Sequence, residues 1–299
     1  MSNIAMAHSF TIGSRQFEFG TRTFIMGILN VTPDSFSDGG RYLDASRAID
    51  RALQMQEEGA DIIDIGGEST RPKSSAYGEG ADRVSVEEEL RRVLPVVSKV
   101  ASKLSIPISV DTTKSVVAEK ALAEGASMIN DVSAFSFDPR MVSVIAFQQA
   151  TAIAMHMLGT PKTMQINPGY DNVTREVKNF LAERTGLARN AGIRQVIIDP
   201  GIGFGKRLED NVALIRHIGE FRSLGCPVMV GVSRKGFIGA LTDTPIEARV
   251  EGSIAAAIVA ATNGADIVRV HDVRETKRAL LISDAIIRSR PVQDPVTSA

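Results

Sequence analysis

One short pattern recurs along the chain and restricts the fold more than any other feature. Segments 58–66 (EGADIIDIG), 124–132 (EGASMINDV) and 263–271 (NGADIVRVH) each place a polar residue, a glycine and an alanine before a short apolar run. Segment 191–200 (AGIRQVIIDP) is a looser copy. The glycine suits the left-handed residue that ends a helix, and the apolar run suits a buried strand. The repeat therefore indicates a fold in which helices and strands alternate.

Apolar runs with the length and composition of buried strands are separated by helical patterns along the whole chain. The eight expected strands are 23–29, 62–66, 107–111, 128–131, 152–156, 196–199, 227–232 and 267–271. Helices are expected at 114–124, 139–149, 174–190, 209–224, 247–262 and 274–289, and as apolar stripes at 45–53 and 90–101. Eight alternating units in about 250 residues predict a (β/α)8 barrel, the TIM-barrel fold. An open doubly wound sheet is the alternative, because periodicity cannot show that a sheet closes.

The chain divides into three stretches but only one domain. Residues 1–22 contain an expected β-hairpin at 9–19 with Gly13 in its turn, placed to plug the N-terminal mouth of the barrel. Residues 23–290 form the barrel, and 291–299 are expected to be a flexible tail. Within the barrel, Pro95 is expected to kink or break the helix that contains it.

Composition excludes several classes of protein. A formal net charge of −1 disfavours broad nucleic-acid binding, which needs a basic surface. The single cysteine, Cys226, excludes an intrachain disulfide and a cysteine-based zinc site, and fits a reducing, cytoplasmic setting. We expect no signal peptide, because the N-terminus has neither a basic start nor a long apolar run, and no membrane span, because no stretch reaches about 18 uninterrupted apolar residues.

Polar side chains follow most of the expected strands, at the barrel end where ligands bind. They are Asn30, Asp64, Asp111, Asn130, Asp131, Asp199, Ser233, Arg234, Lys235, Arg269 and His271. Positive groups here suit a phosphate or diphosphate, and they include Arg71 from the loop after the second strand. The acceptors and donors Asp111, Asn130, Asp199 and Lys235 suit a flat, nitrogen-rich heterocycle. The sequence therefore predicts an active site at this rim.

Each of these residues also has a structural interpretation. Asp111 and Asp199 could cap a helix or fix a turn, and Arg269 with His271 could form a salt bridge to Asp199 or Glu68. His156 is expected to be a hydrogen-bonded core histidine rather than a catalytic base. GIGFGK (201–206) matches neither a dinucleotide fingerprint nor a phosphate-binding P-loop, and is read as a tight glycine turn that lets the backbone approach a flat ligand.

Seven segments in register resemble dihydropteroate synthases of the pterin-binding family, over residues 24–273. The two most specific are MGILNVTPDSFSDGG (26–40) and GGESTRP (66–72). The others are IND (129–131), MHMLGTPKTMQ (155–165), DPGIGFGK (199–206), GVSRKGFIG (231–239) and RVHDV (269–273). The resemblance implies a (β/α)8 barrel that condenses a dihydropterin diphosphate with 4-aminobenzoate, is a target of sulfonamides and forms a homodimer.

The resemblance also implies roles for individual residues. The pterin would be bound by Asp111, Asn130, Met155, Asp199 and Lys235, and the diphosphate by Asn30, Arg71, Arg269 and His271, with Mg²⁺ at Asn30. The 4-aminobenzoate would lie against Thr70, Ser233, Phe36 and Phe204. Asp111, Lys235, Asp38 and Arg71 would act in catalysis, Asp38 by ordering the closed site.

Two other functions stay open on the sequence. A methyltetrahydrofolate-type methyltransferase barrel would not need the SRK and RVHDV segments, and a non-catalytic pterin-binding paralogue should have lost a loop residue such as Asp38 or Arg71. The chain departs from the family pattern in three places. Segment 73–83 is long, Ala134 stands where glycine is common, and Gly236 stands where serine is common.

Overall fold

The computed structural model describes residues 8–31, 41–69 and 83–288, and its centre is a closed ring of eight parallel strands. Their bounds are β3 (Phe24–Asn30), β4 (Ile62–Gly66), β5 (Ile108–Asp111), β6 (Met128–Asp131), β7 (Thr151–Met155), β8 (Val196–Asp199), β9 (Met229–Gly231) and β10 (Ile267–Val270). The hydrogen-bonded order is β8-β7-β6-β5-β4-β3-β10-β9. A parallel bridge between Ile198 and Val228 joins the two ends, with the Ile198 N–H donating to the Pro227 carbonyl at 3.0 Å. The sheet is therefore a (β/α)8 barrel, and the open doubly wound alternative is wrong.

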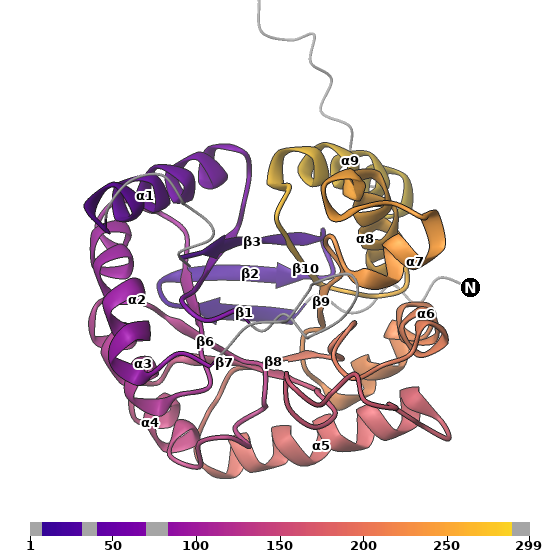
Figure 1. Cartoon of the computed structure of the whole chain (residues 1–299), viewed down its shortest axis with the longest axis horizontal. Coiled ribbons are helices and arrows are strands. Elements are labelled where there is room, and N and C mark those ends of the chain that lie inside the picture. The colour runs from indigo at the N-terminus through magenta and orange to yellow at the C-terminus, as the bar shows by residue number, and fades with distance from the viewer. Residues whose placement is uncertain (1–7, 32–40, 70–82, 289–299) are drawn as a thin grey trace, which may run out of the picture.

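The helices form an outer layer around the strands (Figure 1). Their bounds are α1 (Arg41–Glu57), α2 (Val86–Ala101), α3 (Ser115–Ala123), α4 (Met141–Phe147), α5 (Val173–Asn190), α6 (Leu208–Arg216), α7 (Gly236–Thr242), α8 (Val250–Thr262) and α9 (Val273–Ile287), with 3₁₀ segments η2 (Ile218–Leu224) and η3 (Ile246–Ala248). The regions 209–224 and 247–262, expected as single helices, each contain a 3₁₀ segment beside an α-helix. None of the described helices combines the length and apolar composition that a membrane crossing requires.

The recurring glycine pattern is confirmed as a helix-to-strand joint. Gly59, Gly125, Gly192 and Gly264 have φ angles of 101°, 108°, 96° and 114°. In each copy the next residue's N–H bonds to a carbonyl five residues earlier, as in a Schellman cap: Ala60 to Met55, Ala126 to Ala121, Ile193 to Ala188 and Ala265 to Ala260. One local device thus ends four helices and starts the strands that follow them.

The expected break at Pro95 does not occur, because α2 is one uninterrupted helix. Pro95 lies on the exposed side of α2, whereas Val93, Val96, Val97 and Val100 are buried. Proline removes one backbone hydrogen bond, and burial of the apolar face outweighs that loss.

The N-terminal hairpin consists of β1 (His8–Ile12) and β2 (Arg15–Phe19), with Gly13 in a left-handed turn conformation. Its side chains Ile12, Phe17 and Phe19 belong to one buried cluster with Phe24 and with residues from the starts of other barrel strands. In Figure 1 the hairpin lies across the centre of the ring. The expected plug at the N-terminal mouth is confirmed.

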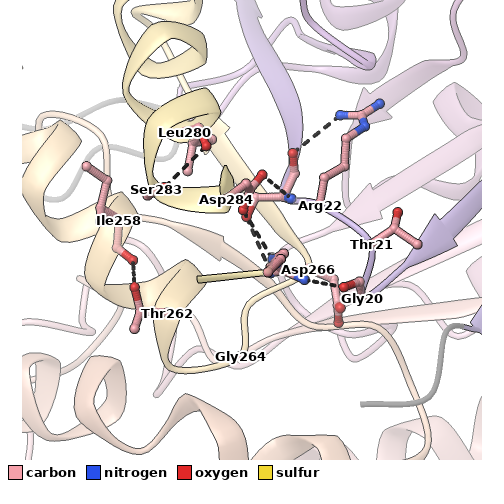
Figure 2. A network of polar contacts seen from close by, with 12 residues as sticks. Gly20, Thr21, Arg22, Ile258, Thr262, Gly264, Asp266, Leu280, Ser283 and Asp284 are labelled. Atoms are coloured by element: carbon pink, nitrogen blue, oxygen red, sulfur yellow. Dashed lines mark hydrogen bonds and ion pairs between the residues drawn. The ribbon is translucent and has the colours of Figure 1, made fainter. Parts of the chain in front are cut away.

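Buried carboxylates stabilise the same N-terminal end. Asp61 forms an ion pair with Arg22 and accepts a backbone N–H of β3, and Asp266 does the same with Arg222 and a backbone N–H just before β9. Asp284 accepts both the backbone N–H and the hydroxyl of the residue that precedes β3, at 2.8 and 2.9 Å (Figure 2). These polar groups are satisfied by the protein itself, so this end of the barrel is structural.

Candidate active site

The carboxyl ends of the strands bring a charged cluster together at the opposite mouth. Arg269 on β10 donates from Nε to Asp64 on β4 at 2.6 Å and from Nη2 to Asp111 on β5 at 2.9 Å. Asn130 on β6 donates to the same Asp64 oxygen, Oδ2, at 2.9 Å. Side chains from β6 and β10 therefore meet at the Asp64 carboxylate of β4, and Arg269 links them to Asp111 on β5.

The sequence placed Asp64 at this rim but assigned it no role in binding or catalysis. The salt bridge suggested for Arg269 exists, but its partners are Asp64 and Asp111 rather than Asp199 or Glu68. Glu68 instead pairs with Lys114. The available signal was an aspartate inside the apolar run 62–66, because a carboxylate in a fully buried strand needs a partner.

Asp199 and Lys235 lie beside this cluster. Asp199, the last residue of β8, accepts the Gly201 N–H at 2.7 Å, so it does fix the turn after its strand. Burial lowers the pKa of Lys235 to about 8, and the nearby charges of Asp199, Arg269 and Asp111 also shift it. Asp199, Arg269 and Asp111 therefore lie close enough to Lys235 for their charges to act on its ammonium group.

Burial dominates the electrostatics of the carboxylates. It raises the pKa of Asp111 to about 7, although Arg269 acts in the opposite direction. Burial also raises the pKa of Asp199. For Arg269, burial alone would lower the pKa, but the carboxylates of Asp64 and Asp111 hold it above its ordinary value. The side chain of Asp111 accepts from Arg269, and the N-cap residue of α3, Lys114, makes no side-chain capping bond.

Two acceptor atoms in this cluster have no donor. Asp64 Oδ1 and Asn130 Oδ1 are buried without a hydrogen-bond partner among the described residues. Leaving a buried acceptor unpaired costs about 1–3 kcal/mol. Both atoms would be satisfied by a ligand that carries N–H groups.

The side suited to an anion contains His271, Ser233 and Asn30. The Ser233 hydroxyl lies 3.0 Å from His271 Nδ1 and accepts the His271 backbone N–H at 3.2 Å, so it fixes the imidazole. A Cβ on Gly66 would lie 3.8 Å from Asn30 Oδ1 and 3.6 Å from Asp111 Cβ. Asn30 and Asp111 therefore flank Gly66, and the missing side chain keeps the space between them open.

An apolar cluster at the same mouth contains two of the predicted site residues, Met155 and Phe204. Its other members are Val132, Met157, Met164 and Phe137. The Lys235 Nζ atom lies 4.1 Å from the centroid of the Phe204 ring, in a cation–π contact. The Lys235–Phe204 contact thus joins this apolar cluster to the charged cluster.

The segment 201–206 is a tight glycine turn, as predicted. A Cβ at Gly201, whose φ is +70°, would lie 1.9 Å from the His156 carbonyl oxygen, so only glycine fits. His156 is buried and hydrogen-bonded, and burial lowers its pKa to about 2. This confirms a neutral core histidine.

Some predictions concern residues that the structure does not describe. Phe36, Asp38, Thr70 and Arg71 lie outside the described residues, as does most of the long segment 73–83. Ala134 is described, and its φ of 47° is the left-handed conformation that glycine adopts at least cost.

Comparison with known proteins agrees with this geometry. The sequence profile of the family described as pterin-binding enzymes matches residues 26–271. The chain belongs to this family. Within it, dihydropteroate synthase from Synechocystis is 45% identical over 93% of this chain and 94% of its own length.

Solved structures of pterin-binding enzymes match the fold closely. A Yersinia pestis dihydropteroate synthase in a sulfonamide drug complex has a TM-score of 0.87 and 41% identity, covering 95% of this chain and all of that one. A Xanthomonas albilineans dihydropteroate synthase with 4-aminobenzoic acid has a TM-score of 0.86 and 44% identity, with the same coverage. The latter enzyme in complex with 7,8-dihydropteroate has a TM-score of 0.79, covering 90% of this chain and 95% of that one.

Proposed function

We propose that this chain catalyses the dihydropteroate synthase reaction, joining 6-hydroxymethyl-7,8-dihydropterin diphosphate to 4-aminobenzoate with release of diphosphate. The observation that carries the proposal is the cluster of Arg269, Asp64, Asp111 and Asn130, in which Asp64 Oδ1 and Asn130 Oδ1 are unpaired buried acceptors. A cation beside a set of acceptors suits a substrate with a diphosphate at one end and N–H groups at the other. Family membership and the relatives' activity support the same reaction.

The pterin ring would lie among Asp111, Asn130, Asp199 and Lys235, with Met155 against its face. The amide of Asn130 and the carboxylates of Asp111 and Asp199 accept hydrogen bonds from ring N–H groups, and Lys235 donates to a ring oxygen or nitrogen. The bond to Asn130 Oδ1 also gives a partner to a buried acceptor that has none among the described residues.

The reaction breaks the bond between the pterin CH₂ carbon and the diphosphate oxygen. The bonding electrons leave with the diphosphate, whose growing charge Arg269 and His271 would stabilise as donors. The carbon left behind is a cation conjugated with the dihydropterin ring, and the Asp111 carboxylate would stabilise it electrostatically.

The 4-aminobenzoate would lie along Phe204 and Ser233. Its amine nitrogen donates its lone pair to the cation, forms the new C–N bond and then loses a proton. Because an arylamine is already neutral at pH 7, no strong general base is needed.

The resemblance implies Mg²⁺, and Asn30 fits that ion as a partial ligand. Among the described residues no cluster of three or more His, Cys, Asp or Glu side chains could hold a metal. Mg²⁺ characteristically binds through few protein oxygens, with waters and substrate phosphates completing its shell, so Asn30 Oδ1 beside the diphosphate is a suitable donor. When bound, the ion would neutralise charge on the leaving diphosphate. Roles for Phe36, Asp38, Thr70 and Arg71 likewise stay proposals based on the resemblance.

A homodimer is proposed from an exposed apolar face on α9. Its members are Leu281, Ile282 and Ile286, which are 51%, 66% and 76% exposed. Helix α8 lies beside α9 (Figure 1) and adds Val259, which is 48% exposed. A second copy of the chain would cover this face through a two-fold contact, and exposed apolar side chains grouped on one surface are typical of such an interface.

A cytoplasmic location is proposed from Cys226, the single cysteine, which is buried and forms no disulfide.

The test is a direct assay. Purified protein is mixed with Mg²⁺, 6-hydroxymethyl-7,8-dihydropterin diphosphate and 4-aminobenzoate, and both diphosphate and 7,8-dihydropteroate are quantified. Equal amounts of the two products are expected, and a sulfonamide should suppress them until excess 4-aminobenzoate is added. Pterin binding without turnover would indicate the non-catalytic paralogue. Methyl transfer from methyltetrahydrofolate would indicate the other alternative.

A further inference from the structure

A buried lysine that the proposed reaction does not use lies behind the glycine turn. Lys206 is only 4% exposed. Its Nζ atom lies 2.9 Å from His156 Nδ1, 3.0 Å from the Phe204 carbonyl oxygen and 3.4 Å from the His156 carbonyl oxygen. It therefore joins the segment after β7 to the turn after β8.

The three contacts match the donor capacity of an ammonium group. A protonated lysine offers three N–H donors, and neutral His156 offers Nδ1 as an acceptor. No hydrogen bond connects Lys206 to a carboxylate within the described ranges, so no direct ion pair offsets its burial. Because burying a cation is costly, an apolar side chain of similar length would be the cheaper choice for packing alone.

The carbonyl that Lys206 binds belongs to the residue that touches the site. The Phe204 ring carries the Lys235 ammonium at 4.1 Å from its centroid. A Cβ on the preceding residue, Gly203, would lie 3.1 Å from Lys235 Cδ, so the turn also packs directly on the lysine stem. A shift of the turn would therefore move both the Phe204 ring and the Lys235 ammonium.

Other side chains hold other parts of the same turn. Gln165 donates to the Gly203 carbonyl at 2.9 Å, and Tyr170 donates its hydroxyl proton to the Gly205 carbonyl at 2.8 Å. Asn211 accepts the Gly203 N–H at 2.6 Å. The Phe204 carbonyl is held by Lys206 instead. Lys206 also bonds to His156, so it ties Phe204 to the segment after β7.

We propose that Lys206 is a positioning residue, whose three hydrogen bonds hold the Phe204 ring in register with Lys235 and so shape the surface on which the 4-aminobenzoate lies. The inference rests on the proposed function for the identity of that substrate. Its physical part, that Lys206 orders the turn 201–205, stands on geometry alone. The two parts are tested by different measurements.

The test compares Lys206→Met with Tyr170→Phe. The first removes the donors at Phe204, and the second removes one donor at the outer end of the same turn. Amide hydrogen exchange of a peptide spanning 201–206 is measured in both, together with the Michaelis constants for both substrates. Lys206→Gln, which keeps a neutral donor, is the second variant if the methionine substitution prevents folding.

Lys206→Met should speed exchange at Gly203 and Phe204 and raise KM for 4-aminobenzoate about tenfold or more, with KM for the pterin substrate changed far less. Lys206→Gln should give a smaller change of the same kind, and Tyr170→Phe should leave both Michaelis constants at wild-type values, because its bond is to the Gly205 carbonyl rather than to Phe204. Unchanged exchange in a folded Lys206 variant, or an equal rise in both Michaelis constants, would overturn the proposal. Faster exchange in an enzyme whose wild type makes no dihydropteroate would instead overturn the proposed function.

Discussion

At the scale of single residues, the site depends on one cation shared between two carboxylates. Arg269 binds Asp64, which is fully buried, and Asp111, which faces the site. Asp64 lies 205 residues from Arg269 in the chain. Sequence position could place Asp111, Asn130, Asp199 and Arg269 at strand ends, because a barrel gathers those ends. It could not reveal which of them pair, because pairing depends on side-chain reach across the ring.

Asp111→Asn should lower kcat about 10²- to 10³-fold, because the amide cannot stabilise a carbocation as a carboxylate does. The substitution keeps a hydrogen-bond acceptor of the same shape, so the dissociation constant for the pterin should change much less. Steady-state kinetics and calorimetric binding of the pterin measure the two effects. Equal losses in both quantities would show that Asp111 only binds.

The pH dependence of kcat/KM should be bell-shaped with a maximum between about 7 and about 8. Burial raises the pKa of Asp111 to about 7, so below that pH the carboxylate becomes protonated and activity falls. Burial lowers the pKa of Lys235 to about 8, so above that pH its ammonium loses its charge and activity falls again. In Asp111→Asn the acidic limb should disappear, and a limb that persists would assign it to another group.

At the scale of elements, local sequence predicted the helix-to-strand joints because their physics is local. The left-handed glycine is needed wherever the chain reverses from helix into strand, and Gly59, Gly125, Gly192 and Gly264 all adopt it. The interruptions between α6 and η2 and between η3 and α8 were not predicted, because apolar spacing barely distinguishes α from 3₁₀ geometry. The expected break at Pro95 did not occur, since tertiary burial outweighed a local rule.

Gly192→Ala should destabilise the protein by about 1–2 kcal/mol, because a Cβ is unfavourable at φ +96°. Gly186→Ala, inside α5, should stabilise it by about 0.5–1 kcal/mol through lower chain entropy in the unfolded state. A Cβ at either position meets nothing within 4 Å, so packing does not confuse the comparison. Urea denaturation measures both, and effects of the same sign would contradict the account.

At the scale of the whole molecule, the number of units could be predicted but closure could not. All eight expected strands are present, with bounds that differ by a few residues. The ring closes through the contacts of Ile198 with Pro227 and Val228, which join β8 to the shortest strand, β9. Such a contact does not change the spacing of apolar residues, so the sequence could not predict it.

The exposed face of α9 should make the protein a dimer in solution. Ile286→Glu combined with Ile282→Glu places charges in the proposed interface and should shift the protein to a monomer, because unpaired buried charge is unfavourable. Phe147→Glu, on α4 and 86% exposed, is the matched control and should leave the dimer intact. Light scattering after size-exclusion chromatography gives the mass, and a monomeric wild type would refute the interface.

A crystal structure with a pterin analogue and 4-aminobenzoate bound together tests the central claim, that one barrel mouth gathers an anion-binding side and a heterocycle-binding side. The account predicts the pterin ring within hydrogen-bonding distance of Asp111, Asn130, Asp199 and Lys235, with the second ligand against Phe204. Density for the pterin away from these residues, for example at the hairpin end of the barrel, would contradict it.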